Sequence, residues 1–340
     1  MKFLLISEDE SNAFLLDKLQ AEEHETRWLA KSAHPEAWSD ILTKSLGLQE
    51  AIEWRPDITI VDGVGFGPVV KQMQAADLRV FGGGRIQDRL SEDWLYSMGL
   101  LDTLKIPTHG VEKFTSVADA AEYIHAKEQA WYYRGPDGSG FGTDTTQGMQ
   151  EMLAEMYQNG NVPAVFTLQR GFPSYHGSKI RLHPEFYIAG MFNERGLMDP
   201  VLQIQAAYNL LPDRQGIDTC EGVTVTPLKI EDPDVQATLR KCEPMFKTMQ
   251  YRGWAFMGVV YGEREEGDSY GPIVTDFFLT PPPGFWACFV GGLKMKLGLF
   301  LDRAVNPNRP NTPFDFWDGV VSSRLLSVPP YPMTEAPWIS

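Results

Sequence analysis

Short apolar runs alternate with helical patterns along the first part of the chain. The runs Lys2–Ile6 (KFLLI), Asp57–Val61 (DITIV) and Arg79–Phe81 are continuous enough for buried strands, and polar or glycine-rich residues follow each of them. Apolar residues at helical spacing lie between them, over Asn12–Gln20 and Val69–Ala76. This order predicts a doubly wound parallel α/β sheet, in which ligands lie at the carboxyl ends of the strands.

The middle of the chain contains helical patterns around a glycine-rich segment. Glu92–Leu104, Val117–His125 and Thr146–Tyr157 have helical spacing, and Trp131–Arg134 is a predicted strand. The segment Gly135–Thr143 (GPDGSGFGT) has four glycines in nine residues, which predicts a flexible loop.

The last part of the chain is typical of an antiparallel sheet with helices. A tail rich in proline begins at Asn306, and we expect it to lie extended over the surface. Predicted strands are Glu185–Phe192, Val201–Ala207, Trp254–Tyr261 and Ile273–Leu279, and predicted helices are Asp232–Met249 and Phe285–Ala304.

Composition narrows the functional classes. The formal charge of the 340 residues is -15, so phosphate backbones are repelled and general nucleic-acid binding is not expected, although a local basic pocket can hold a small phosphate compound. Acidic residues follow the first apolar run too early for a signal peptide, and no run reaches the length of a membrane helix. The three cysteines show no metal-binding spacing, so we expect free thiols in a cytoplasmic protein.

Several segments, in this order, resemble phosphoribosylamine–glycine ligase, a member of the ATP-grasp superfamily. Phe81–Thr108 ends in KIPT and resembles the entry into the ATP-grasp domain, and Gln205–Val223 resembles the substrate loop. Tyr251–Gly253, with MGVVYG and GPIVTDFFL after it, resembles the last sheet of that domain, and LLSVPPYP (Leu325–Pro332) resembles the first strand of the C-terminal domain.

The resemblance implies a division into domains. Residues 1–107 correspond to an N-terminal α/β domain and residues 108–305 to an ATP-grasp domain, with a small subdomain at 108–170 and a large one at 171–305. Residues 306–340 correspond to an extended remnant of the C-terminal domain.

The resemblance also implies an ATP site, and this chain departs from it. Where the family has a lysine on the entry helix, this chain has Trp94, and where a second lysine ends the strand before the glycine-rich loop, it has Arg134. The loop residues Gly138, Ser139, Gly140 and Gly142 either form a backbone cradle for phosphates or simply connect two elements.

Metal ligands are altered in the same way. The family holds magnesium with a Glu and an Asn two residues apart on one strand, and this chain has Asp276 and Phe278 there. Asp276 is therefore the predicted metal ligand, and Phe278 is expected to fill the nucleotide space together with Trp94. Glu185 matches an acidic position of the family, as a further ligand, a ribose contact or an exposed strand residue.

A second pocket is implied for the substrate. Asp62, Asp218 and Thr219 match hydrogen-bonding positions of the family, and Arg214 either pairs with a substrate anion or lies on the surface. Two functions follow as hypotheses: a diverged ATP-dependent carboxylate–amine ligase with an altered ATP and magnesium site, and a module that binds a small molecule or a protein without turnover.

Overall fold

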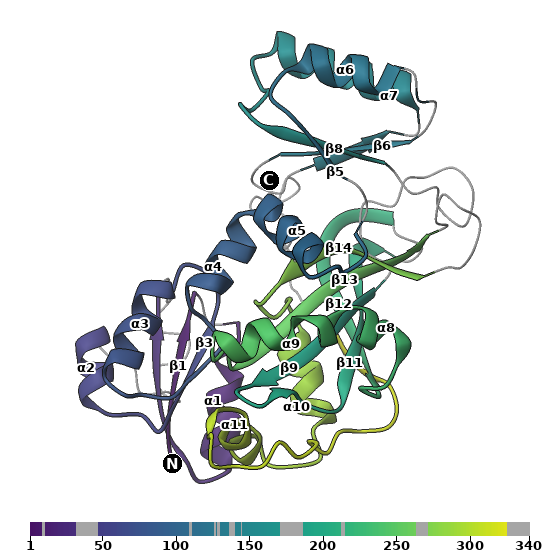
Figure 1. The fold of residues 1–340 in the computed structure, drawn as a ribbon. Helices are drawn as coiled ribbons and strands as arrows, with labels where there is room; N and C mark the ends of the chain where they lie inside the picture. Colours follow the sequence, from purple (N-terminus) through teal and green to yellow (C-terminus); the bar gives the residue numbers. More distant parts are fainter. Residues whose placement is uncertain are drawn as a thin grey trace, which may run out of the picture.

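The structure is a computed structural model of the whole chain, and it contains three sheets (Figure 1). The residues that it describes are 1–8, 11–31, 47–108, 111–125, 127, 130–135, 140–143, 145–170, 186–211, 215–262 and 271–324, without the side chains of 170, 206–211, 215–221, 262 and 271.

The first sheet is parallel and has the strand order β2-β1-β3-β4, so the predicted α/β fold is confirmed. Alternate residues of β1 face two separate cores: Phe3 and Leu5 contact one, and Leu4 and Ile6 the other. Burial on both sides explains why the strands are continuous apolar runs rather than alternating ones. The elements are β1 (Lys2–Ser7), α1 (Phe14–Ala21), β2 (Glu25–Ala30), α2 (Leu48–Glu53), β3 (Ile58–Asp62), α3 (Gly67–Ala75) and β4 (Val80–Phe81).

Two helices, α4 (Arg85–Glu92) and α5 (Trp94–Thr103), connect the first sheet to the rest of the chain. They meet at Asp93, whose carboxylate accepts a hydrogen bond of 2.9 Å from the amide of Tyr96 and caps α5. Helix α4 was not predicted, because its polar residues outnumber its apolar ones.

The second sheet, of strand order β5-β8-β6-β7, is antiparallel and packs against α6 and α7 on one face (Figure 1). The prediction of a loop over Gly135–Thr143 is wrong for residues 140–143, which form β7 and pair with β6. The ring of Phe141 stacks on Tyr133 at 4.8 Å, and this packing outweighs the low strand propensity of the glycines. The elements are β5 (Val111–Phe114), α6 (Val117–His125), β6 (Trp131–Arg134), β7 (Gly140–Thr143), α7 (Thr146–Gln158) and β8 (Phe166–Arg170).

The third and largest sheet has the strand order β14-β13-β9-β11-β12-β15, with β10 paired to β9. Its pairs are antiparallel, as predicted. The strands are β9 (Phe186–Asn193), β10 (Gly196–Leu197), β11 (Val201–Leu211), β12 (Gln215–Leu228), β13 (Gly253–Gly262), β14 (Gly271–Phe278) and β15 (Val321–Arg324).

Two helix predictions for this region need correction. The helix expected over Asp232–Met249 is broken at Thr238, which has non-helical backbone angles, and the one expected over Phe285–Ala304 is broken after Gly292. The tail, which was expected to be extended, includes the strand β15, which pairs with β12. The helices are α8 (Pro233–Ala237), α9 (Leu239–Thr248), α10 (Phe285–Gly292) and α11 (Leu297–Val305).

An aromatic core joins the first and third sheets. The ring of Trp254, on β13, lies 5.0 Å from that of Phe289, on α10, and Phe289 in turn lies 4.8 Å from Phe300, on α11. Phe81, on β4, contacts Trp286 at 5.9 Å and so brings the first sheet into the same core. This core fixes the first sheet against the large one.

None of the described helices is long and apolar enough to cross a bilayer.

Candidate functional site

Arg134 and Asp276 form an ion pair between the second and third sheets. The guanidinium Nη1 lies 2.8 Å from Oδ1 of Asp276, although the two residues are 142 positions apart in the chain. Only 11% of the Arg134 side chain and 22% of the Asp276 side chain are exposed. The structure thus brings together the predicted phosphate contact and the predicted metal ligand.

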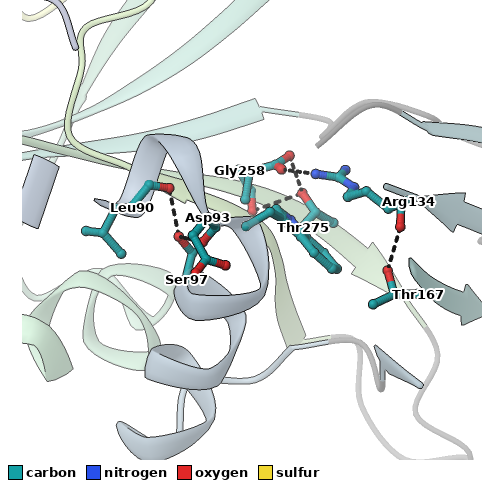
Figure 2. A network of polar contacts seen from close by, with 9 residues as sticks. Leu90, Asp93, Ser97, Arg134, Thr167, Gly258 and Thr275 are labelled. Carbon is teal, nitrogen blue, oxygen red and sulfur yellow. Dashed lines mark hydrogen bonds and ion pairs between the residues drawn. The ribbon is translucent and has the colours of Figure 1, made fainter. Parts of the chain in front are cut away.

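Alternation along β6 determines that Arg134 faces the large sheet. Trp131 and Tyr133 point toward α6 and α7 and are buried in that core, so Tyr132 and Arg134 lie on the opposite face. Figure 2 shows Arg134 directed from its strand toward Gly258 and Thr275 of the large sheet. The carbonyl of Arg134 accepts a hydrogen bond of 3.2 Å from the Thr167 hydroxyl of the neighbouring strand, which holds the end of β6.

A β-bulge sets the direction of Asp276. On β14, Asp276 is opposite Gly258 and Val274 is opposite Val259, so Thr275 is an extra residue in the strand. The Thr275 hydroxyl lies 3.3 Å from the carbonyl of Gly258 and 3.3 Å from Oδ2 of Asp276. Both carboxylate oxygens of Asp276 are therefore engaged, one by Arg134 and one by Thr275.

Trp94 lies beside this pair on the first turn of α5. The guanidinium carbon of Arg134 is 4.6 Å from the centre of the indole ring and 5.3 Å from that of Tyr132, so the cation is held between two aromatic rings. The indole Nε1 donates to the carbonyl of Thr275 at 3.3 Å. Burial raises the pKa of the Tyr132 phenol, and the charge of Arg134 opposes this effect.

Phe278 lies two residues beyond Asp276 and is half-buried. Its ring stacks on Phe256 at 5.4 Å and meets Tyr187 edge-on at 5.5 Å. Apolar surface therefore adjoins Asp276 along β14. That Phe278 fills the nucleotide space remains a prediction, and part of its ring is exposed.

The described residues fit an anion at this site better than they fit magnesium. Nε of Arg134 is buried and has no hydrogen-bond partner within the part of the chain that the structure describes, so one donor is left for an acceptor such as a phosphate oxygen. Magnesium needs several oxygen ligands. The described ranges contain no group of three or more His, Cys, Asp or Glu able to hold a metal, and Asp276 is already paired.

The glycine-rich segment is described only in part. Gly138 and Ser139 lie outside the described residues. Gly140 pairs with Arg134 and Gly142 with Tyr132. A Cβ on Gly140 would lie 2.7 Å from the Tyr132 hydroxyl, so this glycine is needed for packing.

The predicted substrate residues are spread over two places. Asp62 ends β3, and its carboxylate accepts from Asn12 at 2.5 Å and from the indole of Trp286 at 3.3 Å. Asp218 and Thr219 belong to β12, within a long pair of strands where a loop was expected, and their side chains are not described. Glu185 and Arg214 lie outside the described residues.

Sequence reasoning named Arg134 and Asp276 as candidate site residues and Trp94 as a replaced position, but it missed their mutual contacts and the contacts of Thr275. No sequence pattern connects the end of β6 to β14, since their contact depends on how the two sheets face each other. A threonine within an apolar strand was the only sequence signal for the bulge.

Comparison with known proteins identifies the fold. No protein-family model and no curated protein matches the chain. Phosphoribosylamine–glycine ligase from Thermotoga maritima is a similar solved structure, with 13% identity, 98% of this chain and 82% of that chain covered, and a TM-score of 0.73.

Two further ligases have the same arrangement. N5-carboxyaminoimidazole synthase from Aspergillus clavatus, solved with ADP and 5-aminoimidazole ribonucleotide, is 9% identical over 93% of this chain and 79% of its own, with a TM-score of 0.59. D-alanine–D-alanine ligase from Bacillus anthracis is 12% identical over 83% of this chain and 87% of its own, with a TM-score of 0.51. At such identities the similarity concerns the fold, and the chain has the fold of the ATP-grasp ligases.

Proposed function

We propose that this chain is a diverged ATP-grasp carboxylate–amine ligase, related to phosphoribosylamine–glycine ligase, in which Arg134 takes the phosphate-binding role of the family's lysine. One observation supports this most strongly: Arg134 and Asp276 face each other between the second and third sheets, with a buried donor of Arg134 still without a partner. Related ligases have been solved with ADP, which supports a nucleotide as the ligand.

The ligase reaction requires the negative charge of the ATP phosphates to be neutralised, because a negatively charged carboxylate has to approach them. In such a ligase the carboxylate oxygen attacks the γ-phosphorus and ADP leaves; the amine then attacks the acyl phosphate and phosphate leaves. The role of Arg134 in this proposal is to bind the phosphates, which requires its pairing with Asp276 to loosen. Asp276 then competes with the nucleotide for the guanidinium of Arg134.

A second candidate function is a module that binds a small molecule or a protein without turnover. Trp94 and Phe278 favour it, because both place apolar rings beside Asp276. Among the described residues Arg134 is the cation paired with Asp276, and a desolvated triphosphate with a single cation beside it is disfavoured.

The variant Asp276→Asn tests the proposed function. Removal of the carboxylate charge frees Arg134, so ATP alone should bind roughly tenfold more tightly than to the wild type, equivalent to about 1.4 kcal/mol. Added magnesium should give the variant no further stabilisation. The measurement is the melting temperature of the full chain against ATP concentration, with and without magnesium.

Asp318→Asn is the matched control, since it makes the same change at a side chain that is 97% exposed. It should respond to ATP as the wild type does. If ATP changes the melting temperature of neither the wild type nor Asp276→Asn, the binding module without turnover becomes the favoured function in place of the ligase. If magnesium stabilises Asp276→Asn as much as the wild type, the magnesium ligands lie elsewhere.

A further inference from the structure

A cavity of about 760 Å³ lies along the free edge of β4, on the opposite side of that strand from β3. Its walls come from α3, β4 and the first turn of α4, from the turn between α9 and β13, and from the segment after α11. Neither Arg134, Asp276 nor Asp62 lines it. The volume is that of a small-molecule site.

The cavity concentrates positive charge on an acidic protein. Lys71, Arg79, Arg85 and Arg252 line it with a single acid, Asp77, whereas the whole chain carries -15. These cations come from three parts of the fold: α3, the β4–α4 region and the turn before β13. Charge of one sign gathered in a concave site attracts ligands of the opposite sign.

Two of the arginines are held in place by acids outside the cavity wall. Arg79 Nη1 lies 3.5 Å from Oδ1 of Asp302, and Arg252 Nη2 is hydrogen-bonded to Glu194. Nε of Arg252 is buried and has no partner among the described residues. Burial lowers the pKa of Arg252, and the nearby positive charge of Arg79 lowers it further. An anion between the two guanidiniums would relieve this repulsion.

The other two cations carry no such restraint. Lys71 and Arg85 are exposed and form no ion pair with any residue in the described ranges. Long cationic side chains at the mouth of a cavity can close over an anion, with charge-assisted hydrogen bonds.

The backbone adds further donors. Gly82, Gly83 and Gly84 have φ values of 77°, 70° and 100°, a left-handed conformation that side-chain-bearing residues rarely adopt. Helix α4 then begins at Arg85 without a side-chain cap, so no capping side chain takes its first amides. The Gly82 and Gly83 amides are used within the fold: Gly82 donates to the carbonyl of Arg252 at 2.6 Å, and Gly83 donates to Oε1 of Gln87 at 2.7 Å.

We propose that this cavity is a second ligand site, which binds a small molecule through a phosphate group. Donors converge on it from three directions, which suits the tetrahedral oxygens of phosphate better than a planar carboxylate. The remaining volume holds the rest of a small phosphorylated metabolite. This site is independent of the nucleotide site proposed above, because the two share no residue.

Calorimetric titration of the full chain with inorganic pyrophosphate, without magnesium and at constant ionic strength, tests the proposal. The double variant Lys71→Gln/Arg85→Gln should bind at least about tenfold more weakly, since two charge-assisted contacts are lost. Arg89→Gln is the matched control: Arg89 lies on the same helix, outside the cavity, against the ring of Tyr96 at 3.6 Å, and this variant should bind like the wild type.

Two further titrations distinguish this site from binding at the nucleotide site and from a preference for carboxylates. Arg134→Met should keep the pyrophosphate binding that Lys71→Gln/Arg85→Gln loses, so that loss of binding in Arg134→Met with none in the double variant would assign the ligand to the nucleotide site and overturn the proposal. Citrate should bind more weakly than pyrophosphate. No binding of pyrophosphate, equal binding by the double variant, or tighter binding of citrate would each overturn it.

Discussion

Replacing Arg134 with Met is expected to lower the free energy of unfolding by about 2–3 kcal/mol at neutral pH, because it leaves Asp276 largely buried and without its cation. The Arg134–Asp276 pair is mostly shielded from solvent, with side-chain exposures of 11% and 22%, so the effect should exceed that of a surface pair. Met preserves the apolar stem between Trp94 and Tyr132, which limits the loss of packing. Urea unfolding followed by tryptophan fluorescence measures the change.

The double variant Arg134→Met/Asp276→Asn completes the comparison. It should be more stable than Arg134→Met alone, because an uncharged amide at position 276 no longer needs a cation. If the free energy of unfolding of Arg134→Met were within about 0.5 kcal/mol of the wild-type value, the ion pair would contribute little to stability in solution.

Replacing Phe289 with Ala is expected to cost about 3–5 kcal/mol, the usual range for removing a fully buried phenylalanine. Its ring contacts Trp254, Phe300 and Phe316 and so connects α10 with the large sheet, α11 and the segment that follows. Loss of the ring leaves a cavity where these elements meet, and rigid neighbours refill such a space only in part. Calorimetric melting of the full chain reports the loss.

Phe289→Leu and Tyr157→Ala are the controls. Leu keeps much of the apolar volume and should lose roughly half as much or less. Tyr157 is 69% exposed at the end of α7, and its replacement should change stability by about 0.5 kcal/mol or less. Equal losses for Phe289→Ala and Tyr157→Ala would contradict the importance of the aromatic core.

The elements that periodicity predicted correctly are those with a strong apolar pattern. The run Lys2–Ile6 became β1, and the spacing of Val117–His125 became α6. Pattern failed where tertiary contact decides the conformation. Residues 140–143 contain two glycines and still form a strand, because Phe141 packs on Tyr133. The long helix expected over Asp232–Met249 is broken at Thr238, and no proline or glycine at that position signals the break.

The candidate site was predictable as separate residues and not as an arrangement. Resemblance to the ligase family pointed to Arg134 and Asp276 by their positions on two strands. The two residues form an ion pair because the second and third sheets face each other and because the bulge at Thr275 directs Asp276. Neither feature appears as a local pattern in the sequence. The predicted residues 138, 139, 185 and 214 lie outside the described structure and remain predictions.

Strand β15 affects how this protein behaves at high concentration. The large sheet would otherwise end at β12, whose outer row of amides and carbonyls could pair with a strand from another molecule. Val321–Arg324 occupies four positions of that row, from Val225 to Gly222. The segment after the last helix therefore shields a sheet edge, and its removal would be expected to favour edge-to-edge aggregation of otherwise folded molecules.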